Sequence, residues 1–251
     1  MKSTEFILTV SMGKRLIARG LMAEPAVRRA MTEHRLLIVS GTTNAYVAEE
    51  ALRAIGDSTP FPSKADRRGI TVPHGARVTP GQSEFDLLID HGRACFDRTV
   101  FEIAPELTAD DMLMKGANAL HLPTGEAGVL IGHPQGGTLI PVISAAIGRR
   151  AQLIVPIGVE KRVDRRIGEL AQLSNASHAD GPRLCPIPGR TYTELDALIT
   201  LTGAERADIL AAGGAMGAEG CVYFMVQGDE ESIARTRELV DSLKAEPPTQ
   251  L

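Results

Sequence analysis

Short apolar runs rich in β-branched residues alternate with amphipathic stretches along most of the chain, and this alternation constrains the fold most. Residues 36–39 and 153–159 are the clearest apolar runs, and a stretch with helical periodicity follows the first of them at 45–55. Such alternation is typical of βα units around a parallel sheet. We therefore predict an α/β fold with a Rossmann-like, mostly parallel sheet, helices on both of its faces and a small C-terminal α+β extension.

Other segments also have the period or composition of a strand or a helix. The remaining predicted strands cover residues 6–10, 85–89, 112–114, 119–122, 129–131 and 221–226. The remaining predicted helices cover residues 14–31, with a second helix starting at Pro25, and residues 138–147 and 204–212. Asp229 is predicted to cap a final helix, where Glu230 and Glu231 in the first turn favour the helix dipole.

The pattern divides the chain into three parts. Residues 1–190 are predicted to form a ligand-binding α/β core, residues 191–244 a C-terminal α+β segment, and residues 245–251 a tail. Within the core, residues 56–84 lose periodicity and contain four prolines and four glycines. So long an irregular segment is usually a lid, an oligomer arm or a disordered insert. Residues 174–190 are predicted to form a second polar, proline-rich connection.

Composition argues against several classes of function. The chain has 27 Lys and Arg against 31 Asp and Glu, a net charge of −4, whereas nucleic-acid binding usually needs a basic excess. Its 3 cysteines show no C-x-x-C spacing, so neither a disulfide framework nor structural zinc is expected. The longest mostly apolar stretch, at 139–147, is too short for a membrane span, which needs about 20 residues. We expect a cytoplasmic protein that binds neither nucleic acid nor membrane.

The strongest functional pattern is the run of Gly41, Thr42, Thr43 and Asn44 between the apolar run at 36–39 and a predicted helix. A strand that turns into a helix at such residues presents free backbone N–H groups and two hydroxyls to one point. The helix dipole favours negative charge there, so a phosphate or carboxylate fits. The alternative is that Thr43 or Asn44 merely caps the helix.

A second loop of this kind contains Gly136, Gly137 and Thr138, again between a predicted strand and a predicted helix. Paired glycines let the backbone approach a ligand closely, and an ordinary glycine-rich turn is the alternative. Loops at the carboxyl ends of neighbouring parallel strands face one crevice, so the two loops are predicted to share one ligand.

Charged residues after other predicted strands are candidates for catalysis. Lys115 follows the strand at 112–114, while Asp90, Glu126 and Glu160 lie at or after further strands. Loops at strand ends commonly carry catalytic groups. For Lys115, a surface turn is an equally good interpretation.

No metal site or cofactor is predicted. His91, His121 and His133 show no ligand spacing typical of a metal centre. The glycine-rich run at 213–217 precedes a predicted strand instead of following one, so it is not a dinucleotide-binding fingerprint.

Two segments resemble parts of one superfamily of proteins that bind or convert small molecules. They are the turn formed by Gly41, Thr42 and Thr43, and the apolar strand that leads into Lys115. This superfamily contains ribose-phosphate isomerase, glucosamine-phosphate deaminase, the sugar-binding domains of some bacterial regulators and the CoA transferases. The resemblance covers residues 13–160. It implies that the turn binds phosphate and that Lys115 is the counterpart of the isomerases' active-site lysine.

The resemblance implies an enzyme that isomerises a small phosphorylated sugar or sugar acid, of the aldose–ketose type. From the irregular segment at 56–84 we also expect a homodimer or higher homo-oligomer. Asp90, Glu126 or Glu160 would move the proton, and Lys115 would stabilise the enediolate oxygen. Two alternatives stay open. Glu126 followed by Ala127 and Gly128 resembles the glutamate loop of CoA transferases, where that glutamate attacks a thioester. A non-catalytic sensor of a phosphorylated ligand is the other.

Overall fold

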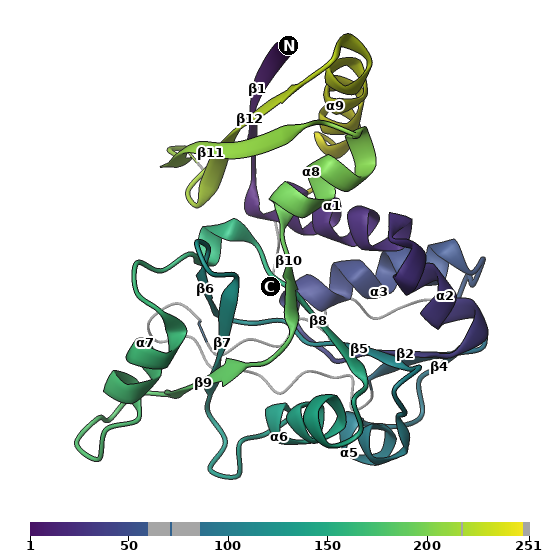
Figure 1. The fold of residues 1–251 in the computed structure, drawn as a ribbon, viewed down its shortest axis with the longest axis vertical. Coiled ribbons are helices and arrows are strands. Elements are labelled where there is room, and N and C mark those ends of the chain that lie inside the picture. Colours follow the sequence, from purple (N-terminus) through teal and green to yellow (C-terminus); the bar gives the residue numbers. More distant parts are fainter. Residues whose placement is uncertain (60–70, 72–85, 217, 248–251) are drawn as a thin grey trace.

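The chain has a mixed α/β fold, and the computed structural model describes residues 1–59, 71, 86–216 and 218–247 (Figure 1). Its main sheet has six strands. They are, in spatial order, β10 (Arg190–Tyr192), β8 (Gln152–Pro156), β5 (Met112–Met114), β2 (Arg35–Ile38), β3 (Leu87–Asp90) and β4 (Arg93–Cys95). The first four are parallel, whereas β3 and β4 form an antiparallel hairpin beside β2. The expected parallel arrangement is therefore correct for one part of the sheet and wrong for the other.

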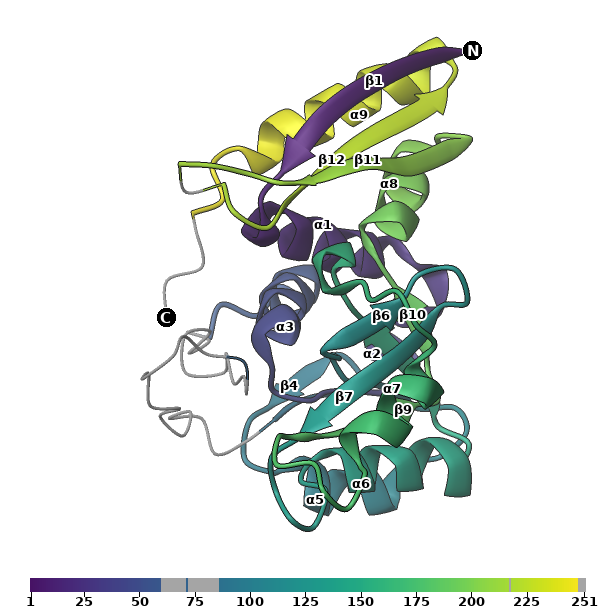
Figure 2. The same cartoon turned by 90° about the vertical axis from the view of Figure 1, so that its left-hand side faces the viewer.

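Helices cover both faces of the main sheet, as predicted (Figures 1 and 2). On one side lie α2 (Pro25–Glu33) and α3 (Thr42–Ala54). On the other lie α5 (Val100–Ile103), with η1 (Ala104–Glu106), and α6 (Leu139–Ile143), with η2 (Ser144–Gly148). The strands between these layers are apolar on both faces, which is why β2 is a continuous apolar run and not an alternating one.

Helix α1 (Val10–Ala23) packs between α3 and the C-terminal part of the chain, and it is buried along almost its entire length. Its Arg15 guanidinium pairs with Glu49 and Glu50 of α3 and with Glu246 beyond the last helix. These pairs join three distant segments of the chain around one charge.

A small antiparallel sheet follows β5 in the chain and consists of β6 (Ala119–His121), β7 (Glu126–Ile131) and β9 (Arg183–Ile187). Helix α7 (Ile167–Ser174) packs against β9. The polar connection predicted at 174–190 thus contains a strand. Pro186 argued against a strand in the sequence. It lies on an edge strand, however, where its missing N–H costs no hydrogen bond between strands.

The C-terminal unit takes one strand from the start of the chain. Its sheet has the order β1 (Lys2–Leu8), β12 (Cys221–Gly228) and β11 (Arg206–Gly213), with α9 (Glu230–Leu243) packed against it. The Phe6 ring stacks on Phe224, with centroids 6.0 Å apart. The predicted strand at 6–10 therefore belongs to this unit, although the expected division of the chain assigned it to the core.

The helix predicted at 204–212 is wrong, because strand β11 occupies these residues and the helix, α8 (Glu194–Thr202), comes earlier. Thr193 and Asp196 form a capping box at its start, and Gly203 ends it in the left-handed conformation, with φ 70°. The predicted cap of α9 is confirmed, since Asp229 accepts a hydrogen bond from Ser232 N at 2.7 Å.

Two expectations concern residues outside this description. The irregular segment at 56–84 lies mostly outside the described residues, as does the end of the tail at 245–251. Among the helices that are described, none combines the length and the apolar character needed to cross a bilayer.

Candidate functional site

Polar residues follow all four parallel strands of the main sheet, and the parallel direction brings them to one edge. Asp86 reaches the same edge because it precedes β3, which runs the opposite way. We call these residues the edge cluster. Its members are Thr42, Thr43, Asp86, Lys115, Glu160, Lys161 and Glu194.

The start of α3 forms one side of the edge cluster. Its first internal hydrogen bond runs from Ala45 N to Gly41 O at 2.8 Å, so the amides of Thr42, Thr43 and Asn44 precede the helical ladder. Gly41 cannot cap them with a side chain. The Thr43 hydroxyl is buried and has no hydrogen-bond partner in the described part of the chain. Free amides and a hydroxyl at a helix start are the arrangement that binds an anion.

Asn44 has a different part from the one predicted. Its side-chain amide nitrogen donates to Val39 O at 2.7 Å and to Met114 O at 3.0 Å. The side chain is fully buried and ties α3 to β2 and β5. Asn44 therefore positions the first turn of α3, and its backbone amide is one of those that precede the helical ladder.

Lys115 occupies the centre of the edge, after β5 and between the ends of β2 and β8. Its backbone N–H donates to Ile154 O at 3.2 Å, which holds it against β8. Burial lowers the pKa of the Lys115 ammonium to about 8, although the Asp86 carboxylate opposes this change, and the Lys161 ammonium lowers the pKa further. Among the described residues, no carboxylate forms an ion pair with Lys115.

The Asp86 side chain binds backbone N–H groups. Its two carboxylate oxygens accept hydrogen bonds from Ser40 N at 2.8 Å and from Val100 N at 2.6 Å, and the side chain is buried. Asp86 thereby fixes the chain just before α3 and contributes negative charge near Lys115 without pairing with it.

The other side of the edge cluster comes from η3 (Val159–Lys161) after β8 and from α8 after β10. Glu194 is buried and accepts a hydrogen bond from Val159 N at 2.9 Å. Burial raises the pKa of the Glu194 carboxyl to about 8, and the nearby Glu160 carboxylate raises it further. Lys161 opposes this change, and its Nζ donates to Ala117 O at 3.0 Å.

Helix α1 closes over Glu194 at a glycine. A Cβ on Gly13 would lie 2.5 Å from Glu194 Oε1, so any larger residue there would displace the carboxyl. The close approach of α1 is thus part of what buries Glu194.

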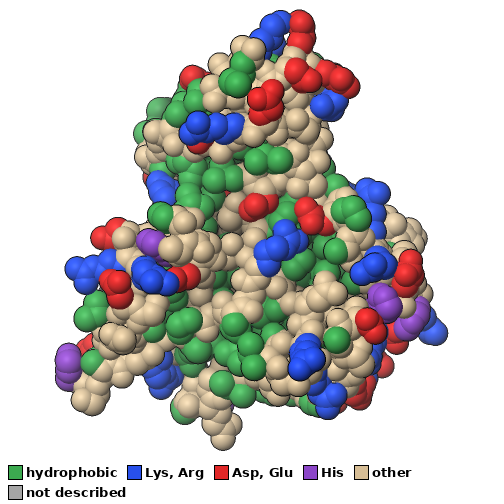
Figure 3. Space-filling view, in the orientation of Figure 1, with side chains coloured by type: hydrophobic (Ala, Val, Ile, Leu, Met, Phe, Trp, Pro, Cys, Tyr) green, Lys and Arg blue, Asp and Glu red, His purple; other side chains and the backbone are tan. Residues whose placement is uncertain are grey.

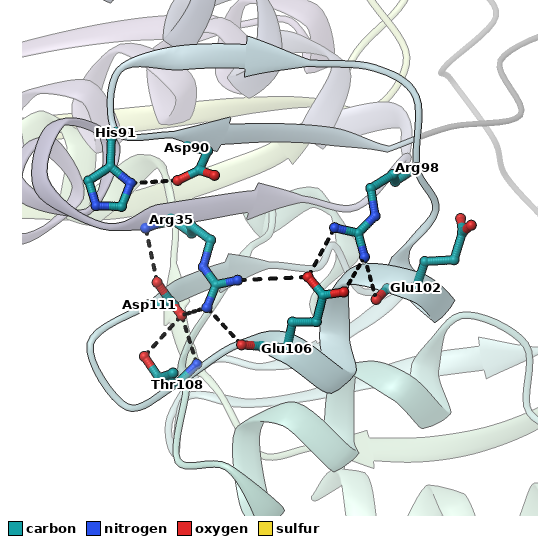
Figure 4. Close-up of polar contacts among 8 residues, drawn as sticks. All are labelled: Arg35, Asp90, His91, Arg98, Glu102, Glu106, Thr108 and Asp111. Atoms are coloured by element: carbon teal, nitrogen blue, oxygen red, sulfur yellow. Dashed lines mark hydrogen bonds and ion pairs between the residues drawn. The ribbon is translucent and has the colours of Figure 1, made fainter.

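The structure places Asp90 at the opposite edge of the main sheet (Figure 4). It ends β3, and the antiparallel register sets it beside Arg35 at the beginning of β2. Its carboxylate contacts His91 Nδ1 at 2.5 Å. A local pattern cannot give the direction of a strand, and the reversed β3 removes Asp90 from the edge cluster.

Glu126 also lies apart from Lys115, at the start of β7 in the small sheet. It accepts hydrogen bonds from Arg166 Nε at 2.9 Å and from Ile167 N at 3.1 Å, so it caps α7. The hydrogen bond from Arg166 is the largest cause of the lowered pKa of the Glu126 carboxyl. Glu126 lines an open cleft of about 440 Å³ that also includes Glu169 and Gln172.

The loop with Gly136, Gly137 and Thr138 does not meet α3 either. It follows β7 of the small antiparallel sheet and leads into α6. In both views of the fold this connection lies near α5 and α6, with α3 on the other side of the main sheet (Figures 1 and 2). Gly136 and Gly137 have φ of 81° and 56°, and the Thr138 side chain caps nothing. These observations fit an ordinary turn.

No family model matches this chain, and no curated protein or solved structure matches it either. Function must therefore be inferred from the edge cluster and the molecular surface. Figure 3 shows Lys and Arg side chains interspersed with Asp and Glu, with no single basic patch on the visible face.

Each of the three histidines considered earlier contacts a residue close to it in the sequence, and His91 contacts Asp90. His121 Nδ1 lies 2.8 Å from Thr124 Oγ1, and His133 Nδ1 accepts from Gln135 N at 3.2 Å. In the described ranges, no three His, Cys, Asp or Glu side chains are grouped in a way that could hold a metal ion.

Sequence reasoning missed Asp86 and Glu194. Asp86 is the one acid inside the otherwise apolar beginning of the strand predicted at 85–89, and this was a usable signal. Glu194 follows the threonine of the capping box formed by Thr193 and Asp196, which marks the start of a helix.

Proposed function

We propose that this chain is an enzyme that acts on a small phosphorylated sugar or sugar acid, by aldose–ketose isomerisation through proton transfer next to the carbonyl. One observation carries the proposal: Lys115 is a half-buried ammonium at the centre of a sheet edge, beside a helix start whose first amides have no side-chain cap in the described part of the chain. We also propose, as part of the same hypothesis, that the main sheet is Rossmann-like.

The start of α3 is suited to the phosphate. The amides of Thr42 and Thr43 and the Thr43 hydroxyl would donate to its oxygens, which would give the buried hydroxyl the partner it lacks. An ammonium that is partly removed from water is destabilised by that removal, and a bound anion offsets the cost. Lys115 and Lys161 therefore favour a negatively charged ligand at this place.

The carboxyl groups of the edge cluster supply the proton transfer. Glu160 would act as the base at the carbon next to the carbonyl, while Glu194, with its pKa of about 8, holds a proton at neutral pH for return to the product. The charge of Lys115 would stabilise the enediolate oxygen. A positioned acid or base contributes about 10²–10⁴ in rate. Asp90 and Glu126 have no part in this scheme.

A panel of paired ligands tests the proposal. Ribose 5-phosphate, ribose, a phosphorylated sugar acid and its unphosphorylated form would be compared by thermal shift and then by turnover. A phosphorylated ligand at a hundred times its dissociation constant should add about 2.7 kcal/mol to the free energy of unfolding. The proposal is wrong if every member of each pair gives the same shift. Binding without turnover of any ligand would instead support the sensor.

Acyl transfer by Glu126 has weaker support, although the cleft at Glu126 provides room for a ligand. The carboxylate is held by Arg166 and Ile167 N, and the ion pair makes it a poorer nucleophile. A glutamyl adduct on the peptide containing Glu126, after incubation with an acyl-CoA, would reverse this preference. A homo-oligomer and a cytoplasmic location stay predictions.

A further inference from the structure

We propose that Lys115 is not only a stabilising cation but an amine nucleophile, which forms an imine with the carbonyl carbon of the substrate. This inference rests on the proposed function, since it uses the same site and a carbonyl substrate. It adds a covalent route to hydrogen exchange or inversion next to the carbonyl, and it limits the substrates to anionic aldehydes and ketones.

The position of Lys115 supports this step. Strand β5 lies between β2 and β8, so the residue after it lies next to the loops that follow both neighbours. The start of α3 lies on one side and η3 on the other. An anion held by Thr42 and Thr43 would therefore have its carbonyl end directed along the edge toward Lys115, with Glu160, Lys161 and Glu194 on the side of η3.

The charges around Lys115 favour the neutral amine. Asp86 is the acid that opposes neutralisation, but both of its oxygens are occupied by backbone N–H groups. Lys161 places a second ammonium nearby, and burial acts in the same direction. Desolvation and a neighbouring cation are the two ways in which proteins activate lysine as a nucleophile. With a pKa of about 8, Lys115 has a much larger neutral fraction near neutral pH than an ordinary lysine.

The step balances without an oxidant or a reductant. The Nζ lone pair forms a bond to the carbonyl carbon, the carbonyl electron pair moves to oxygen, and a proton passes from nitrogen to that oxygen. Glu194, protonated near neutral pH, then gives its proton to the hydroxyl as the C–O bond breaks and water leaves. The resulting iminium draws electrons from the adjacent C–H bond, whose proton Glu160 accepts. The enamine takes a proton back at the same carbon, and water then adds to the iminium carbon as its bond to nitrogen breaks and frees Lys115. The net change is exchange or inversion of the hydrogen next to the carbonyl. This is a second reaction, separate from aldose–ketose isomerisation, because a proton placed on the carbon bound to nitrogen would leave an amine that water cannot hydrolyse.

Competitive labelling of amines with acetic anhydride across pH measures the reactivity of Lys115 without any substrate. Lys244 is the internal reference, since it is exposed and lies on the surface beside Asp241. Lys115 should reach half of its maximal labelling near pH 8, well below Lys244. In Lys161→Met, its midpoint should move upward. If Lys115 and Lys244 titrate together in the whole protein, the inference is wrong.

Reductive trapping measures the imine itself. The protein would be incubated with dihydroxyacetone phosphate and cyanoborohydride, and then mapped by peptide mass. One adduct is expected on Lys115, with at least a tenfold lower yield from dihydroxyacetone and none on residue 115 in Lys115→Arg.

The outcomes separate the two proposals. If phosphorylated ligands bind, no adduct forms and Lys115→Arg keeps most of its turnover, then the imine is wrong and the lysine acts as a cation. If Lys115 is trapped equally by both ketones and no ligand shifts the melting temperature, then the amine is reactive but the phosphate site of the proposed function is wrong.

Discussion

The two edges of the main sheet differ in how their charges are satisfied. At the edge where the parallel strands begin, which we call the amino edge, Asp111 accepts hydrogen bonds from Arg35 and Thr108, and the Arg35 guanidinium also donates to Glu106 O (Figure 4). At the edge where these strands end, which we call the carboxyl edge, Lys115 is half-buried with a lowered pKa and Glu194 is buried with a raised pKa. The Thr43 hydroxyl there has no described partner. Charged groups that pair with one another stabilise a fold. Charged and polar groups that lack a partner or have a shifted pKa, and that lie together at the ends of strands, indicate a ligand site.

The largest expected effect is at the carboxyl edge. Lys115→Ala should lower turnover by about 10²-fold or more, since an oriented cation contributes that much to a developing oxyanion. Ligand affinity should fall much less than turnover, because the start of α3 and Lys161 still hold the phosphate. The melting temperature should change little, because the substitution also removes a partly desolvated charge. Steady-state kinetics and thermal unfolding would be measured together, with Lys244→Ala as the matched control. Equal loss of binding and turnover would make Lys115 structural.

The amino edge should respond in the opposite way. Asp111→Ala removes the acceptor of Arg35 N and of the Arg35 guanidinium, and breaking such a buried pair costs about 3 kcal/mol of unfolding free energy. Turnover per folded molecule should stay the same. Chemical denaturation would measure the loss, with Asp90→Ala as the control, because its pair with His91 is exposed. A catalytic defect in folded Asp111→Ala would remove the distinction between the edges.

The pH dependence of stability should also separate the edges. Glu194 has its pKa raised from 4.5 to about 8, so its contribution is complete below pH 4.5 and is lost as the pH rises through 8, on the order of a few kcal/mol. Lys115 affects stability at higher pH. Between pH 8 and 10.5 the lysine is deprotonated in the native state but still protonated in the unfolded chain, so the free energy of unfolding should rise again. The pKa of Asp111 is lowered despite its burial, chiefly by Arg35, so its contribution is lost in acid.

Denaturation at a series of pH values measures these slopes. Glu194→Gln should flatten the fall between pH 4.5 and 8 and leave the acid limb unchanged, since the amide can still accept from Val159 N. An unchanged fall in this variant would assign the slope to another group.

The smallest effect is expected at Thr43. Thr43→Val keeps the shape of the side chain and removes a hydroxyl without a described partner, so the free protein should be as stable as before. Affinity for a phosphorylated ligand should fall by about 1 kcal/mol, the usual net value of one hydrogen bond. Calorimetric titration would measure this, and an unchanged affinity would exclude the hydroxyl from the anion site.

The sequence predicted those parts of the site that depend on a short stretch of chain. The apolar run before Gly41, and Lys115 and Glu160 after their strands, follow from local pattern and were placed at the correct edge. Asp90 was misplaced because strand direction is decided by pairing with β2, which lies far away in the sequence.

Glu194 was missed for a related reason. The alanine-rich residues 204–212 fit a helix by composition, but pairing with β12 makes them a strand, and the true helix begins at the capping box. Tertiary pairing overrides such weak local preference. Contacts between distant segments therefore determine the direction of β3 and the strand conformation of β11, which the local sequence pattern does not specify.

The pairing of β1 with β12 has a consequence for synthesis. Lys2 lies opposite Gly228, so β1 leaves the ribosome before its partner and waits until more than 200 further residues have been translated. The core around β2 and β5 has no such delay, and we expect it to form during translation while the terminal sheet assembles last. Deletion of either β1 or β12 would then disturb the same sheet and the same late step.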